Sequence, residues 1–141
     1  MLNLSGVSAS SRETEIKHVK LLILGSGPAG LSAALYAARA ELAPVVLTGI
    51  ELGGQVALTY TIENYPGFPE GVGGLQLGEL FQKQAERFGA RVEFDTAQSV
   101  DLSSRPFKVV TDNGVYAAEA LIISTGARLH QPGPFCRCRA S

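Results

Sequence analysis

The chain is poor in the residue types that mark several protein classes: among its 141 residues there are no tryptophans, one methionine, two histidines and two cysteines. Cys136 and Cys138, with His130 nearby, are too few for a closed zinc site, so no metal is expected. Twelve basic against 13 acidic residues give a net charge of −1, which argues against a nucleic-acid partner. No apolar run approaches the roughly 18 residues of a membrane span, so no membrane partner is expected.

The first residues also lack a sorting signal. Residues 1–17 contain no charged leader followed by an apolar block, and they carry Glu13 and Glu15. We therefore expect a cytoplasmic protein. The serine-rich composition of residues 1–18 predicts a flexible extension before the first strand. With 45% hydrophobic residues, the remainder can form one globular domain with a core.

The most informative feature is an apolar run at 19–24 that continues into a glycine-rich turn and then into an alanine-rich segment. A dinucleotide site requires this order of strand, turn and helix, because the helix N-terminus offers N–H groups to a pyrophosphate. Gly25 permits a tight turn, Gly27 lets the ligand approach the backbone, and Gly30 lets the helix pack closely. The turn reads Gly25-Ser26-Gly27-Pro28-Ala29-Gly30.

A glycine-rich turn alone is weak evidence, because such turns also end strands in proteins that bind nothing. Here a second apolar run follows at 44–48, and Glu51 comes about twenty residues after Gly30. At that distance a carboxylate can accept the ribose hydroxyls of an adenosine. The combination favours dinucleotide binding over a bare turn.

The rest of the pattern predicts an α/β fold, a doubly wound, Rossmann-like parallel sheet with an antiparallel hairpin or meander insert. Apolar residues at helical spacing end at Gly89, which suits a helix C-terminal cap. In the insert, Asn113-Gly114 is expected to supply the positive φ angles of a tight hairpin. The predicted strands are 19–24, 45–48, 91–94, 107–111, 115–118 and 120–124, the last rejoining the parallel sheet; the predicted helices are 29–40 and 75–88, and a long loop spans 49–74.

Residues 20–129 resemble the FAD-binding portion of bacterial-type thioredoxin reductases, in the pyridine nucleotide-disulfide oxidoreductase family. Gly-Gly-Gln at 53–55 followed by Glu-Asn-Tyr-Pro-Gly-Phe-Pro at 63–69 favours these enzymes over the similar ferredoxin-NADP reductases, although related hydroperoxide-reductase flavoproteins share parts of the pattern. The stretches that carry the resemblance are 25–31, 36–40, 48–55, 62–69, 112–114 and 124–127.

The resemblance implies an FAD-binding domain over 19–129. The turn at 25–30 would cradle the FAD pyrophosphate, and Glu51 would bind the adenosine ribose. The loop after the second strand, with Asn64, would wrap the ribityl and isoalloxazine end, while Ala97 and Ala127 would lie beside the adenine. The alternative role for Gln55 and Asn64 is to cap loop backbone groups. The implied loop residues are Thr48, Gly49, Ile50, Glu51, Leu52, Gly53, Gly54 and Gln55.

In this family NADPH passes a hydride to the flavin, which reduces a redox-active disulfide and then thioredoxin. The second glycine-rich domain for NADPH and the Cys-x-x-Cys pair of the family are not found in this sequence, and residues 130–141 depart from its pattern. Cys136 and Cys138 are separated by one residue, which would strain a disulfide, so no catalytic residue is assigned. We expect a truncated or frame-shifted reductase that is not catalytically competent alone. One alternative is a non-catalytic FAD- or nucleotide-binding fragment. The other is one half of a complex that needs a separate chain for the NADPH site and the Cys-x-x-Cys pair. The possible partner is a second copy, in a homodimer, or this missing half.

Overall fold

The computed structural model describes residues 16–127, and the predicted tail at 130–141, with its two cysteines, lies outside them. Within this range the chain forms one mixed sheet of six strands and three helices, with strand order β3-β2-β1-β6-β5-β4. None of the helices in this range is both long enough and apolar enough to cross a membrane. The elements are β1 (Ile16–Leu24), α1 (Pro28–Arg39), β2 (Val45–Leu47), α2 (Gly54–Ala57), α3 (Gly74–Arg87), β3 (Arg91–Glu93), β4 (Ala97–Asp101), β5 (Phe107–Thr111) and β6 (Gly114–Ile123).

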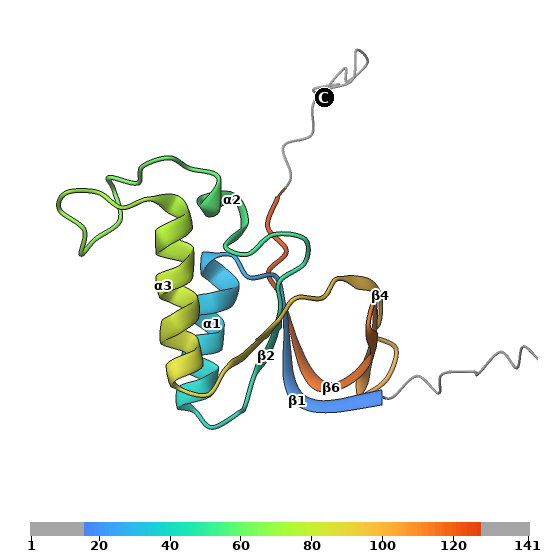
Figure 1. Cartoon of the computed structure of the whole chain (residues 1–141). Helices are drawn as coiled ribbons and strands as arrows, with labels where there is room; N and C mark the ends of the chain where they lie inside the picture. The colour runs from blue at the N-terminus through green and yellow to red at the C-terminus, as the bar shows by residue number, and fades with distance from the viewer. Residues whose placement is uncertain (1–15, 128–141) are drawn as a thin grey trace, which may run out of the picture.

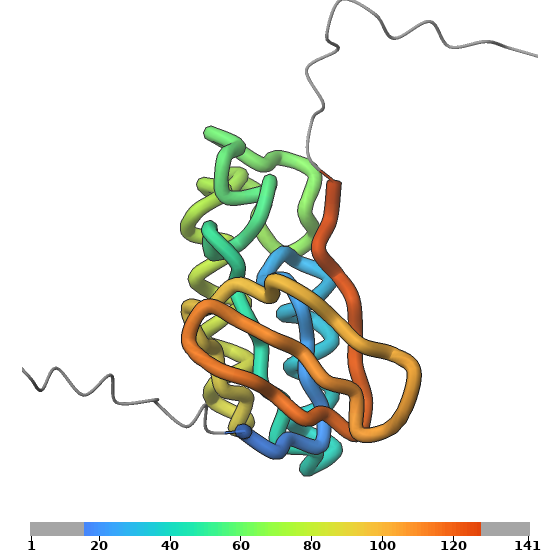
Figure 2. Tube along the Cα trace, turned by 90° about the vertical axis from the view of Figure 1, so that its right-hand side faces the viewer, coloured from blue at the N-terminus to red at the C-terminus, as the bar shows by residue number. Residues whose placement is uncertain are grey.

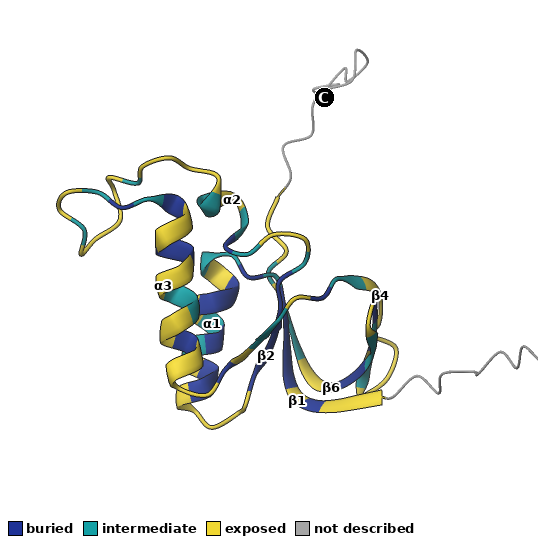
Figure 3. Cartoon of the chain, viewed as in Figure 1, coloured by how far each residue is buried: buried dark blue, intermediate teal, exposed yellow. Residues whose placement is uncertain are grey.

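The molecule has three layers, with helices α1 and α3 on one side of the parallel strands and the antiparallel meander β4-β5-β6 on the other (Figure 1). Because successive side chains of a strand point to opposite faces, β1 contributes to both interfaces. Burial on both faces explains why residues 21–24 of β1 and all of β2 read as continuous apolar runs, drawn dark blue in Figure 3, whereas the start of β1 is exposed and drawn yellow. The expected α/β fold with a parallel sheet and an antiparallel insert is confirmed.

Small side chains dominate the interface between the sheet and the helices. Alanines of α1 and α3 let the helices approach the sheet closely, against branched residues from β1 and β2. This core contains Leu21, Ile23, Ala34, Ala37, Ala38, Val46, Ala85 and Ala90. The other interface is filled by larger groups and holds Val19, Leu22, Leu24, Val45, Leu47, Val109, Tyr116 and Ala118.

The last strand differs from the prediction. The two strands expected at 115–118 and 120–124 are one continuous strand, β6, which curves from the meander into the parallel sheet (Figure 2). Its first half lies between β5 and β1, and its second half continues beside β1. The separation was wrong because curvature buries three consecutive side chains, Tyr116 to Ala118, and then exposes Glu119, which breaks the alternation of a flat strand.

The hairpin between β5 and β6 forms where it was predicted, but its turn chemistry differs. Thr111 pairs with Gly114 across a two-residue loop. Among non-glycine residues of the described range only Glu41 and Ala43 have positive φ, so Asn113 does not. The prediction that the Asn-Gly pair supplies two positive φ angles was therefore wrong. The Thr111 hydroxyl lies 3.0 Å from the Gly114 carbonyl oxygen, so a side chain also contacts the turn, and it donates to the Asp95 carboxylate at 2.7 Å.

Candidate cofactor site

Three segments meet at the carboxyl ends of the parallel strands: the turn after β1, the loop after β2, and the residues that follow β6 (Figure 1). In open α/β sheets, ligands bind at this edge, outside the ends of the strands. The sequence-predicted residues 25–30, 48–55 and 127 all belong to these segments.

Gly25 and Gly30 must be glycine because a Cβ at either position would overlap backbone atoms of the protein itself. Gly25 has φ +104°, and a Cβ there would lie 2.4 Å from the carbonyl oxygen of Ser124. A Cβ at Gly30 would lie 1.9 Å from the carbonyl oxygen of Gly25. The Gly25 amide donates to the carbonyl of Leu47 at 2.9 Å, which links the turn to the end of β2. The turn is therefore tight, and the helix starts directly against it.

Gly27 is different, because no atom lies within 4 Å of the position that a Cβ would occupy. Gly27 is the N-cap residue of α1, where no side chain caps the helix and no acidic residue stands in the first turn. Pro28 follows at the start of the helix, so one of the free donors is already missing. The remaining first-turn N–H groups have no intrahelical partner and carry the positive end of the helix dipole. This donor set and the open space at Gly27 fit a pyrophosphate.

Ser26 connects this turn to the loop after β2. Its side chain is buried, and its hydroxyl lies 3.4 Å from the carbonyl oxygen of Thr48 and 3.3 Å from that of Glu51. The same hydroxyl accepts a hydrogen bond from the Gly53 amide at 3.3 Å. Sequence reasoning placed Ser26 in the turn but did not predict these contacts.

The loop after β2 is also held from its other side. The Thr48 amide donates to the carbonyl of Glu93 at 3.1 Å, and the Gly49 amide donates to that of Asp95 at 3.0 Å. The Gln55 side-chain amide donates to the Ala127 carbonyl, which joins the loop to the end of β6. Gln55 thus pairs with loop backbone, the alternative role considered for it.

The other predicted residues occupy varied positions. Glu51 is exposed, and Ile50 beside it is 76% exposed. Asn64 lines a hollow of about 520 Å³ with Val56 and residues of the connection to α3. Ala97 opens β4 and packs against the core on the meander side. The structure thus links 25–30, 48–55 and 127 by direct contacts, whereas Asn64 and Ala97 lie on separate segments.

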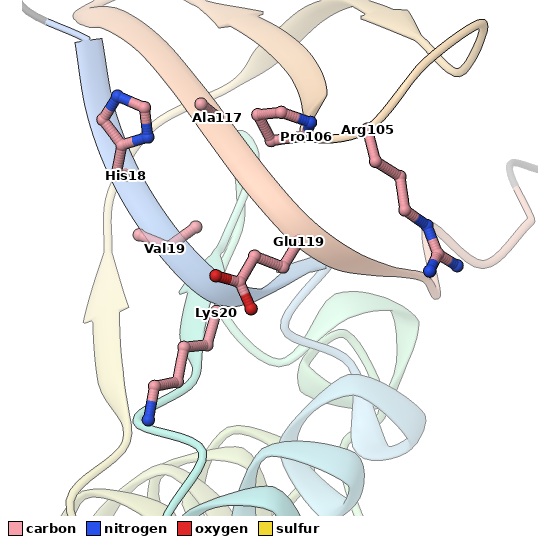
Figure 4. A pocket seen from close by; sticks show the side chains of 7 residues that line it. All are labelled: His18, Val19, Lys20, Arg105, Pro106, Ala117 and Glu119. Carbon is pink, nitrogen blue, oxygen red and sulfur yellow. The ribbon is translucent and has the colours of Figure 1, made fainter.

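A second hollow, of about 470 Å³, contains none of the predicted residues (Figure 4). It is lined by the middle of β1, the two residues just before β5 and the middle of β6, and the β6 residue Glu119 accompanies three basic residues there. This mixture of charges does not resemble a dinucleotide site. The lining residues are His18, Val19, Lys20, Arg105, Pro106, Ala117 and Glu119.

Sequence reasoning missed a polar network beneath the meander. The Lys17 ammonium lies 3.3 Å from a Glu93 carboxylate oxygen and 3.2 Å from the Tyr116 hydroxyl, which itself donates to Glu93. The hydrogen bond with Tyr116, and then that with Glu93, raises the pKa of Lys17, while burial raises the pKa of Tyr116. Burial alone would raise the pKa of Glu93, but the hydrogen bonds from Tyr116 and Lys17 bring it below its ordinary value. The three residues come from three strands, so no local pattern could indicate the network.

The family model for pyridine nucleotide-disulphide oxidoreductases matches residues 19–135. The chain belongs to this family. The match includes the turn, the loop after β2 and the whole described sheet from Val19 onward, which agrees with the resemblance carried by the motifs.

Several relatives of the chain are named thioredoxin reductases. The chain is 55% identical over 114 residues to a thioredoxin reductase of Vibrio cholerae, an overlap that covers 81% of the chain and 36% of the relative. A solved thioredoxin reductase structure from Giardia duodenalis superposes with a TM-score of 0.74 at 44% identity, covering 81% of this chain and 38% of that one. A glucosaminate ammonia-lyase of Pseudomonas fluorescens is 45% identical over 113 residues, covering 80% of the chain and 35% of the relative. The chain spans about a third of the length of the curated relatives it matches.

Proposed function

We propose that this chain is the FAD-binding part of a thioredoxin-disulfide reductase-like flavoprotein. The observation that carries the proposal is the N-terminus of α1, whose first-turn N–H groups no side chain caps, beside Gly27, where a Cβ would meet no atom within 4 Å. Such a donor set suits the two negative phosphates of a dinucleotide. The similarity to thioredoxin reductases over the same residues supports FAD as the dinucleotide.

In this proposal the chain's residues bind and orient the cofactor. The N–H groups of the turn at 25–30 hold the pyrophosphate, and the exposed Glu51 carboxylate accepts the ribose hydroxyls. Ala97 and Ala127 lie beside the adenine. The loop 48–55 and Asn64 surround the ribityl and isoalloxazine end. When bound, FAD supplies the hydride and electron transfer.

NADPH as reductant and thioredoxin as acceptor are further proposals that rest on the relatives named thioredoxin reductase. The 141 residues match about a third of those proteins, so we expect the hydride donor site and the redox disulfide to be supplied by further polypeptide. A separate chain that carries these parts would be that partner, whereas a homodimer, the other partner considered, would still lack them. We place the protein in the cytoplasm, as its sequence predicts.

A different reaction on the same cofactor-binding part is the second candidate. The relative named glucosaminate ammonia-lyase is similar over the same region as the thioredoxin reductases, so similarity here follows the cofactor-binding fold more closely than the reaction. Both candidates use the same proposed dinucleotide site of this chain. They differ in the substrate that a complete protein would accept.

The test is a titration of the purified 141-residue chain with FAD, followed by visible absorption after removal of free ligand. A retained flavin band that does not bleach on anaerobic addition of NADPH is the expected result. Bleaching would mean that the chain itself holds a nicotinamide site, and oxidation of NADPH coupled to thioredoxin reduction would overturn the expectation of an inactive isolated chain. If no flavin band remains after free ligand is removed from a sample saturated with FAD, the proposed function is refuted.

A further inference from the structure

We propose that Ser26 is a positioning residue whose hydroxyl holds the loop 48–53 in the shape that presents Glu51 to the cofactor. The inference rests on the proposed FAD site, but it concerns a side chain whose contacts are with the protein. The dinucleotide turn needs only backbone groups at this position, so a hydroxyl there has a separate purpose.

The contacts of Ser26 all go to one loop. A hydroxyl has one hydrogen, which the carbonyls of Thr48 and Glu51 share at 3.4 and 3.3 Å, and its lone pairs accept the Gly53 amide at 3.3 Å. Ser26 is only 1% exposed, so water does not replace these partners. Removing the hydroxyl would leave the buried Gly53 donor without its partner, which costs more than the hydrogen bond contributes.

The loop has few other means of keeping its shape on this side. Gly53 has φ +82° and precedes the four-residue helix α2, whose N-terminus has no side-chain cap. A Cβ on Gly54 would lie 3.3 Å from the Cα of Gly27, so these two residues approach each other through backbone. Backbone contacts between glycines restrict rotation poorly, because glycine is the most flexible residue. The Ser26 hydroxyl therefore supplies directional contacts between the two segments.

The Ser26 hydroxyl affects cofactor binding through the main-chain atoms that it holds next to Glu51. Ser26 lies against the carbonyl of Glu51 itself, and Gly53 is two residues further on. The Glu51 carboxylate is exposed on a loop, and its affinity for a ribose depends on how little freedom it loses on binding. The hydroxyl fixes the main chain on both sides of Glu51 and so restricts the position of the carboxylate in the chain without ligand.

The experiment compares Ser26→Ala with the matched control Ser124→Ala in the full chain. The Ser124 hydroxyl lies at the same end of the sheet and donates to the carbonyls of Leu24 and Gly25 at 2.9 and 3.3 Å, outside the loop 48–53. The hydrogen-exchange rate of the Gly53 amide is measured by NMR without ligand. It should rise at least about tenfold in Ser26→Ala and stay unchanged in the control. The Kd for FAD should rise about tenfold or more in Ser26→Ala and less than about threefold in Ser124→Ala, whose hydroxyl contacts the turn but not the loop 48–53.

A double-mutant cycle with Glu51→Ala then separates positioning from general stability. If Ser26 acts through Glu51, Ser26→Ala weakens FAD binding less than about threefold when Glu51 is already alanine. An equal loss in both backgrounds, or an equal effect of Ser124→Ala, would overturn the inference. A wild-type chain that binds no FAD would instead refute the proposed function. In that case unchanged Gly53 exchange in Ser26→Ala would overturn the loop contact as well, whereas faster exchange would support it.

Discussion

Gly30 lies so close to Gly25 that a methyl group on it would place its carbon 1.9 Å from the Gly25 carbonyl oxygen. Helix propensity alone favours alanine over glycine inside α1, by roughly 0.5–1 kcal/mol. The overlap is with backbone and cannot be relieved by a side-chain rotation, so the steric cost is expected to prevail. We predict that Gly30→Ala destabilises the chain by at least about 2 kcal/mol, measured by urea denaturation. Equal or higher stability of the variant would show that the turn is looser than described.

Gly27→Ala is predicted to separate binding from folding. Gly27 has φ −68° and ψ 178°, which alanine adopts readily, and no atom lies within 4 Å of the new methyl group. Stability should therefore change by less than about 0.5 kcal/mol. The methyl group would occupy the space proposed for the pyrophosphate, so the Kd for FAD should rise about 100-fold, measured by flavin fluorescence. Unchanged FAD affinity would show that the phosphates do not bind at this turn.

A third prediction concerns the end of α1. Glu41 has φ +60°, and the helix closes there through hydrogen bonds from the amides of Glu41 and Leu42 to the carbonyls of Ala38 and Ala37. This is a position where glycine is normally favoured, because other residues are strained with positive φ. Glu41→Gly should raise the free energy of unfolding by about 0.5–1 kcal/mol. Glu41→Ala is the control, since it removes the carboxylate and keeps the strain. Similar stabilisation by both variants would assign the effect to the charge.

The two long helices were predictable for different reasons. The spacing of apolar residues indicated both, and Gly89 marked the end of α3, where it has φ +102° and its amide donates to the Glu86 carbonyl. The same kind of ending on α1 is made by Glu41, so no glycine signalled it. The predicted helix of 29–40 is nevertheless within one residue of α1 at each end.

Elements with little burial escaped prediction. Four of the five residues of β4 are exposed, so it carries no apolar alternation, and α2 is only four residues long inside the predicted loop. The curvature of β6 could not be foreseen either, because it depends on strands on both sides.

In the candidate site, the sequence indicated which segments meet but not how they are joined. The motif at 25–30 and the acid at Glu51 follow from spacing along the chain. The Ser26 contacts and the hydrogen bond from Gln55 to Ala127 join residues 22 or more positions apart. Such pairings depend on tertiary packing, for which one sequence has no local signal.

The last prediction uses the network around Glu93. Its pKa in the folded chain lies below the ordinary value of 4.5, so the folded state favours the carboxylate. The stabilisation is therefore complete above that value and is lost as the pH falls through the folded pKa. The raised pKa values of Lys17 and Tyr116 add stability that is present at neutral pH and lost only as the solution becomes strongly basic.

Glu93→Gln removes the charge and keeps an oxygen that accepts the Tyr116 hydroxyl. At pH 7 we expect it to lower stability by about 1 kcal/mol, because a charged acceptor strengthens both hydrogen bonds while the partly exposed side chain is still screened. In thermal unfolding this corresponds to a Tm lower by roughly 4 °C. The difference should shrink as the pH falls below about 4.5 and through the folded pKa, where the wild-type carboxylate is protonated. Asp101, whose pKa is lowered by its hydrogen bonds with Ser103, is present in both proteins and cancels from the comparison. A difference in Tm that stays constant over this range would show that the effect of Glu93 is steric and independent of its charge.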